Sequence, residues 1–259
     1  MNARLHRFAL AAVVPLVLLA GWLIWSNAGS SLYFPPLQDI VSTFVVHWFT
    51  PQGWGDIASS LSNLVVGFAI AVVLGIVVGV LVGKLSWLRE LTQPVFDFLR
   101  GLPAPALLPL SIMLLGIGAE QKIGIIAFGG FFPVLLNTID GVASVDPTVK
   151  EMTRVYRISP AATLFRVTLP SAGPQIMAGC RIALSFSLML MVVSELVSSF
   201  AGIGYHTADA QRTYQYTEMW SGLVLLAALG FILNKLFDLV EARVLRWQYG
   251  LQGLSAAGK

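Results

Sequence analysis

The residue best suited to chemistry in this chain is a carboxylate, Glu195, which stands in an apolar run with Ser194 beside it and Ser198 one turn later. Charged groups at membrane depth are candidates for function. Hydrolysis, however, needs a nucleophile, a base and oxyanion donors gathered together, and one glutamate among scattered serines does not supply them. We therefore predict no catalytic site. Glu195, Ser194 and Asn137 could line a polar path across a membrane, or Glu195 could cap a neighbouring helix and hold the packing.

The spacing of the other reactive residues argues against a metal site and a nucleotide site. The histidines, at positions 6, 47 and 206, have no partners at metal-ligand spacing, and the single cysteine, Cys180, excludes a disulfide framework. The stretch from Gly79 to Lys84 looks like a phosphate-binding loop, but only three residues separate its glycines and Leu85 follows the lysine. We expect no metal, no cofactor and no ATP hydrolysis in this chain.

The composition indicates a membrane protein. Hydrophobic residues make up 56% of the 259 and charged residues only 11%, whereas soluble proteins carry about 25% charged residues. An apolar run of about 17–25 residues is long enough to cross a bilayer core. Six runs of about this length are present: residues 8–25, 61–82, 98–115, 123–139, 176–200 and 220–240. We predict an all-α polytopic membrane protein with about six transmembrane helices, of which prolines interrupt the third and fourth.

Basic residues are distributed asymmetrically between the two sides of the predicted bundle. With the N-terminus in the cytoplasm, only Lys122 and Arg212 lie outside, which the positive-inside rule favours. Both termini and a polar loop at 144–174 are then cytoplasmic, and the net charge of +3 needs no nucleic-acid partner. The first run could instead be a secretory signal, but it is longer than a usual signal core, which favours a retained helix.

The chain divides on this basis into an N-terminal anchor helix (1–26), an external segment (27–60), a membrane core (61–248) and a cytoplasmic tail (249–259). Within the external segment, residues 37–48 predict a short helix along the outer surface. The second span carries glycines at four- and eight-residue spacings, all on one face: Gly67, Gly75, Gly79 and Gly83. Small residues let helices approach closely in lipid. Packing within one subunit is the favoured role of this face, and a seam between two copies is the alternative.

The polar cytoplasmic loop predicts two short helices. Asp146-Pro147 is a favourable helix start, and Ser159-Pro160 repeats it. The first helix should run to about Arg157 and the second to about Val167, after which Leu169-Pro170 ends it. Both helices carry apolar residues on one face and charges on others, so the loop could dock a soluble partner or rest on the membrane interface.

This loop resembles the cytoplasmic loop of binding-protein-dependent ABC importer permeases, whose pattern is Glu-Ala-Ala, three residues, Gly, nine residues, Ile-x-Leu-Pro. Glu151 takes the acidic position, and Leu169-Pro170 fits the end of the pattern at the expected distance. Met152 and Thr153 stand where the family has alanines, and Arg157 stands where it has the glycine of the bend. These departures imply a changed bend and a bulkier contact surface.

The resemblance covers most of residues 32–248. Several stretches are similar to the subfamily that imports sulfonates, taurine, nitrate and related small molecules: 34–36, 99–103, 116–118, 131–133, 136–138 and 202–205. The resemblance implies the type I ABC importer permease fold, with the loop as its cytoplasmic coupling helix. It also implies a place in the prokaryotic cytoplasmic (inner) membrane.

The family further implies a set of partners. Two copies of the chain would form the pore, two cytoplasmic ATP-binding subunits would hydrolyse ATP, and an external solute-binding protein would deliver the solute. Docking on the ATP-binding subunit would fall to residues of the loop: Lys150, Glu151, Met152, Thr153, Arg154, Arg157, Leu169 and Pro170.

The implied solute is a sulfonate, taurine or a nitrate-like anion. Asn137, Ser194 and Glu195 are the candidates for its path, although a carboxylate facing the pore would repel an anion. The alternatives are a permease for a cofactor precursor such as a thiamine pyrimidine and, less favoured, an ion-coupled secondary carrier.

Overall fold

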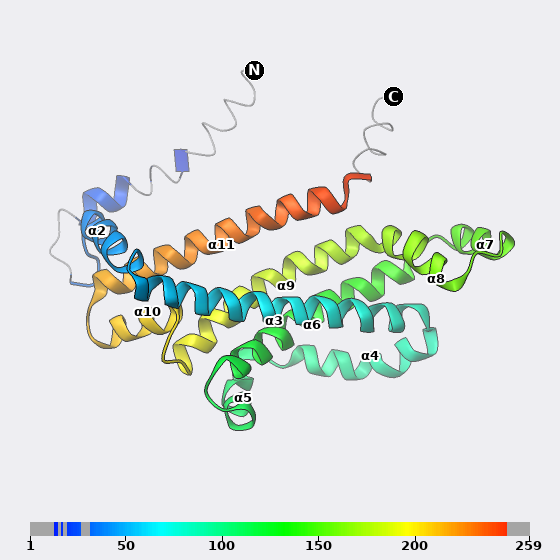
Figure 1. Cartoon of the computed structure of the whole chain (residues 1–259), viewed down its shortest axis with the longest axis horizontal. Coiled ribbons are helices and arrows are strands. Elements are labelled where there is room, and N and C mark those ends of the chain that lie inside the picture. Colours follow the sequence, from blue (N-terminus) through cyan, green and yellow to red (C-terminus); the bar gives the residue numbers. More distant parts are fainter. Residues whose placement is uncertain (1–12, 15–16, 18–19, 27–31, 248–259) are drawn as a thin grey trace, which may run out of the picture.

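The computed structural model describes residues 13–14, 17, 20–26 and 32–247. All regular elements from residue 32 to residue 247 are helical, in the order α2 (Leu37–Trp48), α3 (Pro51–Lys84), α4 (Ser86–Gly101), a 3₁₀ turn (Ala104–Leu107), α5 (Leu108–Leu115), α6 (Ala119–Ala143), α7 (Pro147–Val155), α8 (Pro160–Thr163), a π turn (Leu164–Thr168), α9 (Leu169–Val197), α10 (Ile203–Arg212) and α11 (Tyr216–Val244). The long helices α3, α6, α9 and α11 run side by side along the molecule (Figure 1). The short helices α2 and α10 lie at one end, and α7 and α8 lie at the other.

Four of the helices in the described part are long and apolar enough to cross a membrane: α3, α6, the continuous helix Pro160–Val197, and α11. A fifth span results if α4 and the following segment Ala104–Leu115 are counted together. Half of the first predicted run, residues 8–25, falls outside the described residues. The all-α membrane fold is thus confirmed, with four or five spans in the described part of the chain.

The third predicted span, residues 98–115, is not one straight helix. The chain bends by 84° between α4 and Ala104–Leu115. Leu102 and Pro103 are extended at the bend. Leu102 is pushed out of the helical region because it precedes a proline. The prolines therefore divide the run instead of merely interrupting it, and α4 becomes a separate amphipathic helix beside α6.

The predicted glycine face of the second span packs inside the subunit. A methyl group added at Gly75 would lie 2.7 Å from Cβ of Val134, and one added at Gly79 would lie 2.6 Å from Cβ of Thr138. Gly67 and Gly83 meet α6 in the same way. These glycines therefore let α3 approach α6 closely, which supports packing within one subunit over a seam between copies.

Both predicted helix starts in the loop are present. The Asp146 carboxylate accepts a hydrogen bond from the Thr148 amide at 2.7 Å, and the Ser159 hydroxyl accepts one from the Ala162 amide at 3.3 Å. The second helix does not end at Leu169-Pro170, however, but continues into α9. A π turn precedes Pro170, and the Leu169 amide donates five residues back to the Leu164 carbonyl. This wider turn relieves the clash between a proline ring and the carbonyl four residues earlier.

Candidate functional site

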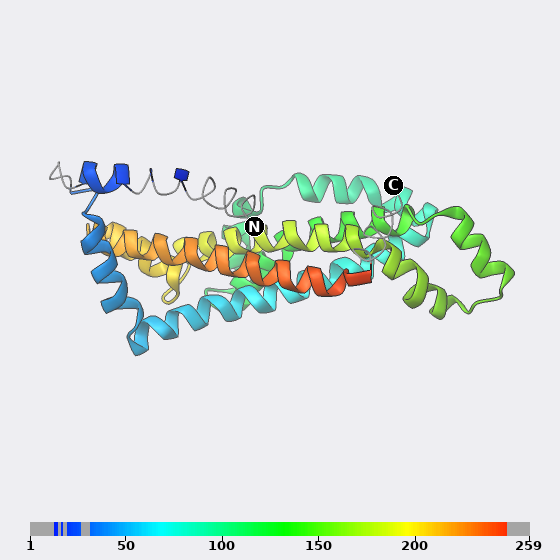
Figure 2. The same ribbon diagram turned by 90° about the horizontal axis from the view of Figure 1, so that it is seen from above.

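The loop between α6 and α9 forms a hairpin that projects beyond the ends of α3 and α11 (Figures 1 and 2). Its outer ridge is apolar: Met152, Val155 and Tyr156 are 55%, 77% and 76% exposed. Their three- and four-residue spacings place Met152 and Val155, and Met152 and Tyr156, on one side of the turn. Exposed apolar side chains gathered on a projecting element mark a contact surface.

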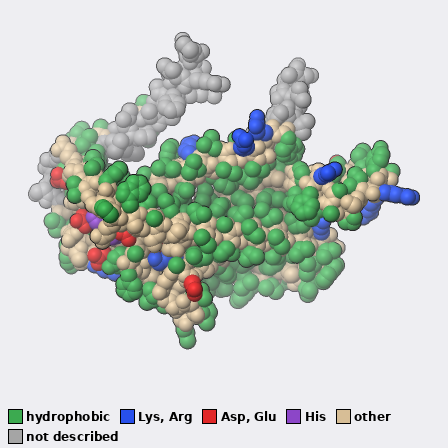
Figure 3. Space-filling model, viewed as in Figure 1, with side chains coloured by type: hydrophobic (Ala, Val, Ile, Leu, Met, Phe, Trp, Pro, Cys, Tyr) green, Lys and Arg blue, Asp and Glu red, His purple; other side chains and the backbone are tan. Residues whose placement is uncertain are grey.

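Charge surrounds this ridge. Four basic side chains of the hairpin are exposed: Lys150, Arg154, Arg157 and Arg166. Glu151 is the exposed carboxylate of α7. Blue side chains accordingly stand out on the α7 end in the space-filling view (Figure 3). A partner surface that covers this hairpin is best matched by a groove with apolar walls and an acidic rim.

Three of the eight residues predicted for docking lie neither on the ridge nor among the exposed charges around it. Thr153 is buried at the bend, where its hydroxyl donates to the Lys150 carbonyl at 2.7 Å and its own carbonyl accepts from the Ile158 amide at 2.9 Å. Leu169 and Pro170 are half-buried at the root of the hairpin, and Leu169 packs against the hydrophobic core. A small side chain at position 153 therefore closes the hairpin, and Leu169 anchors it.

The bend of the hairpin has an unusual backbone. Arg157 has a positive φ of 51°, which is in the left-handed region where glycine is favoured. This is the position at which the resembling family carries glycine. The hairpin thus bends at a non-glycine residue in the left-handed region, which bears some strain there.

Glu195 lies at the opposite end of α9, and it is fully buried. Its carboxylate accepts hydrogen bonds from the Ser60 hydroxyl at 2.8 and 2.9 Å and from the Gly204 amide at 2.9 Å. The Ser60 oxygen also accepts from the Ile203 amide at 3.0 Å. The carboxylate and the serine together satisfy the first amides of α10, which a helix cannot pair internally.

A second carboxylate completes this cluster. Asp56 accepts from the Gly202 amide at 2.7 Å and pairs with Nε2 of His206 at 2.7 Å. Lys122 is also buried, and its ammonium donates to the Ser199 hydroxyl at 2.6 Å and to the Ala201 carbonyl at 3.3 Å. Sequence reasoning missed Asp56, Ser60 and Lys122 as members of one network. The only feature of the local sequence that could have indicated this network was the pair of glycines at 202 and 204, whose amides donate to Asp56 and Glu195.

The other two path candidates differ in position. Ser194 is fully buried, and its hydroxyl donates to the Met191 carbonyl at 2.8 Å. Asn137 donates to the Pro133 carbonyl at 2.8 Å and lines an open groove of about 580 Å³ between α4, α6 and α9. Of the three predicted path residues, Asn137 thus faces a cavity, and Ser194 and Glu195 face the interior of the subunit.

Long apolar helices that carry an exposed basic hairpin at one end are typical of the membrane subunit of a transporter that a separate protein drives. The family described as "Binding-protein-dependent transport system inner membrane component" matches residues 71–246, and the chain belongs to this family. It is a permease of an ABC importer and a multi-pass protein of the inner membrane. Membership implies an ATP-binding subunit and a solute-binding protein as partners.

Curated relatives match nearly the whole chain. A probable ABC transporter permease protein of Brucella abortus (strain 2308) is 33% identical over 248 residues, which cover 96% of this chain and 99% of that protein. The "Putative aliphatic sulfonates transport permease protein SsuC" of Escherichia coli (strain K12) is 34% identical and covers 90% of each chain. The nitrate import permease protein NrtB of Synechocystis sp. (strain ATCC 27184 / PCC 6803 / Kazusa) is 30% identical, over 90% of this chain and 88% of that protein.

Solved structures show the same fold. A chain of the MetNI methionine ABC transporter in an inward-facing conformation aligns with a TM-score of 0.64 at 21% identity, over 75% of this chain and 98% of that chain. A chain of an amino acid ABC transporter aligns with a TM-score of 0.56 at 18% identity, over 81% and 96% of the two chains. At these identities the likeness concerns the fold.

Proposed function

We propose that this permease imports a small oxyanion, with a sulfonate as the first choice and nitrate as the second. The relatives named for aliphatic sulfonates and for nitrate, each at least 30% identical over about nine-tenths of this chain, support that substrate class. An external solute-binding protein delivers the anion to the end of the molecule that carries α2 and α10.

We further propose that two copies of the chain form the pore and that each docks one cytoplasmic ATP-binding subunit through α7. The observation that carries this proposal is the hairpin itself, whose apolar ridge of Met152, Val155 and Tyr156 is exposed together with its basic side chains. Both termini and the hairpin face the cytoplasm in this assembly. ATP-driven closure of the two ATP-binding subunits moves the hairpins and switches the pore between its inward-open and outward-open states.

Affinity purification of the chain from its native membrane tests the assembly. We expect an ATP-binding subunit to be recovered with the permease in mild detergent and to be identified by mass spectrometry. Charge reversal at Glu151→Lys or Arg154→Glu should reduce that recovery and abolish uptake, with membrane insertion unchanged. Arg243→Glu is the matched control, because Arg243 is an exposed basic residue of α11 that lies outside the hairpin. Normal uptake in both hairpin variants would contradict the docking role.

Uptake assays test the substrate. Cells that express the permease with its partners should accumulate labelled ethanesulfonate or taurine, and nitrate more weakly. Accumulation of none of these anions by the intact importer would contradict the proposed substrate class and leave the permease assignment in place.

A further inference from the structure

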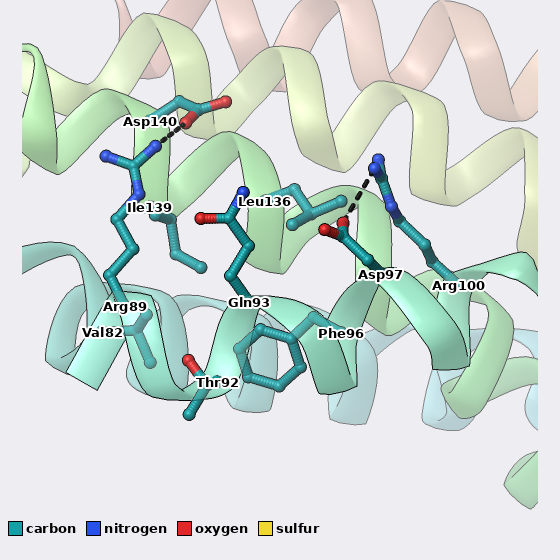
Figure 4. Close-up of a pocket in the computed structure, with 10 residues that line it drawn as sticks. All are labelled: Val82, Arg89, Thr92, Gln93, Phe96, Asp97, Arg100, Leu136, Ile139 and Asp140. Carbon is teal, nitrogen blue, oxygen red and sulfur yellow. Dashed lines mark hydrogen bonds and ion pairs between the residues drawn. The ribbon is translucent and has the colours of Figure 1, made fainter. Parts of the chain in front are cut away.

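A charged pocket lies between α4 and α6, outside the sites described above (Figure 4). It has a volume of about 210 Å³. Five polar side chains of α4 line it: Arg89, Thr92, Gln93, Asp97 and Arg100. All of them except Thr92 follow one another at four-, four- and three-residue spacings, on one face of the helix. Asp140 of α6 pairs with Arg89 at 3.2 Å, and Asp97 pairs with Arg100 at 2.8 Å. The pocket therefore contains two ion pairs, one toward each end.

The pocket adjoins the open groove that contains Asn137. Arg100 and Leu136 line both cavities. The groove has largely apolar walls, which include Phe128 and Phe186. A solute that leaves the apolar groove therefore meets Arg100 first and then enters the charged pocket. Asn137, the predicted path residue that faces a cavity, stands along this route.

The opposite face of α4 shows that its charges are directed inward. Four large apolar side chains lie on that face and are all more than half exposed: Trp87, Leu91, Val95 and Phe98. Charged residues in membrane-spanning regions are costly, face cavities and mark solute pathways. The segregation on α4 thus favours a water-filled path on the side of Arg100 and an apolar neighbour on the other side.

The charge balance of the pocket selects a kind of ligand. Its two arginines and two aspartates sum to zero, so a simple anion would leave one negative charge in the pocket without a partner. Each guanidinium spends one nitrogen on its aspartate and has further donors that suit a tetrahedral oxyanion. Each aspartate can accept hydrogen bonds from an ammonium group. A ligand that carries both an oxyanion and an ammonium group can pair with the arginine and the aspartate of one ion pair. The pocket then stays neutral.

We propose that this pocket binds a small zwitterion that joins an oxyanion to an ammonium group, an aminosulfonate in the first place, as it moves through the permease. Arg100 binds the oxyanion and Asp97 binds the ammonium group. The Arg89–Asp140 pair closes the far end of the pocket. The proposal rests on the proposed function, because it narrows the class of small oxyanions to those that also carry a positive charge.

Protection of an introduced cysteine measures binding without the solute-binding protein. Gln93→Cys places a thiol in the pocket, and the native Cys180 is buried and gives little background. The permease–ATPase complex is placed in phosphatidylglycerol nanodiscs and treated with N-ethylmaleimide. Taurine and ethanesulfonate are the matched probes, because they differ only by the ammonium group. We expect taurine to protect the thiol at an about tenfold lower concentration, the effect of one charge-assisted hydrogen bond.

Two further substitutions identify the groups responsible. Adding Asp97→Asn should raise the protective concentration of taurine about tenfold and remove its advantage over ethanesulfonate. Asp238→Asn is the matched control, because Asp238 pairs with Arg181 on α9 and lies outside the pocket. It should leave the preference unchanged. Equal protection by the two probes, or a thiol that does not react at all, would overturn the proposal.

The headgroup of phosphatidylethanolamine also joins an oxyanion to an ammonium group. Nanodiscs of different lipid composition therefore distinguish a bound lipid from a bound solute. If phosphatidylethanolamine nanodiscs block the thiol while taurine gives no protection in phosphatidylglycerol, the pocket is a lipid site and the solute proposal is overturned. Uptake by the intact importer distinguishes a failure of the pocket proposal from a failure of the proposed function. A complex that prefers taurine in the pocket but imports no sulfonate would contradict the proposed substrate class and leave the pocket assignment standing.

Discussion

At the scale of single residues, the buried carboxylate of Glu195 joins three helices. It extends from α9, and it accepts hydrogen bonds from Ser60 of α3 and from the Gly204 amide of α10. Gly202 has a φ of 115°, and a side chain there would lie 2.6 Å from the Glu195 carboxyl carbon. The backbone between α9 and α10 is therefore shaped around this carboxylate, which indicates a packing role for Glu195.

Removal of the carboxylate tests that role. We expect Glu195→Ala to destabilise the protein by about 2–4 kcal/mol, because the Ser60 hydroxyl and the Gly204 amide lose a charged acceptor while they are buried. Ser62→Ala serves as the control, since Ser62 is exposed on the same helix as Ser60. Thermal unfolding in detergent provides the measurement. An unchanged midpoint in Glu195→Ala, together with a loss of uptake, would assign Glu195 to the solute path instead.

The positive φ of Arg157 leads to a second residue-scale prediction. Arg157→Gly and Arg157→Val remove the same charge, but only glycine adopts a φ of 51° without strain. Because a strained backbone costs on the order of 1–3 kcal/mol, we expect Val to weaken binding of the ATP-binding subunit about tenfold relative to Gly. Co-purification yields at a series of partner concentrations provide the comparison. Equal binding by the two variants would show that the bend does not shape the docking ridge.

At the scale of elements, the contact between α3 and α6 depends on glycines that admit no side chain. We expect Gly79→Ala to destabilise the protein by about 1–3 kcal/mol, because the added methyl group overpacks the contact between α3 and α6 against Thr138. Gly55→Ala on the same helix has open space around it, so it should be neutral or slightly stabilising. Thermal unfolding of the two variants compares them directly. A normal Gly79→Ala midpoint would mean that α3 and α6 can move apart at no cost.

Local patterns in the sequence were sufficient to predict some elements and not others. The helix at 37–48 and the two capped starts in the loop depend on neighbours a few residues away, so they could be predicted. The break after α4 required knowing that Gly101 to Pro103 would bend the chain by 84°. The partners of Glu195 could not be predicted, because Ser60 is 135 residues away and no periodicity connects them. The charged pocket likewise depends on the contact between α4 and α6.

At the scale of the whole molecule, one helix connects the hairpin to the Glu195 cluster. The continuous helix Pro160–Val197 has 38 residues, which corresponds to about 57 Å at 1.5 Å per residue. The α7 hairpin lies at its start, and the hydrogen bonds to α3 and α10 lie at its end. We therefore expect a rotation imposed at the hairpin to be carried across the bundle to the segment that seats α10.

The distribution of charge between the two ends of this helix predicts the orientation of the chain in the membrane. On the face that Figure 3 shows, most acidic side chains lie toward the end that carries α2 and α10, and basic side chains stand out at the α7 end. The positive-inside rule therefore predicts a cytoplasmic hairpin. Single cysteines test this, with the buried Cys180 as the background of the native chain. A membrane-impermeant maleimide should label Gln52→Cys in intact cells and Thr148→Cys only after permeabilisation, since both positions are exposed and lie at opposite ends. The reverse pattern would place the hairpin outside, where no ATP-binding subunit could reach it, and would contradict the coupling role.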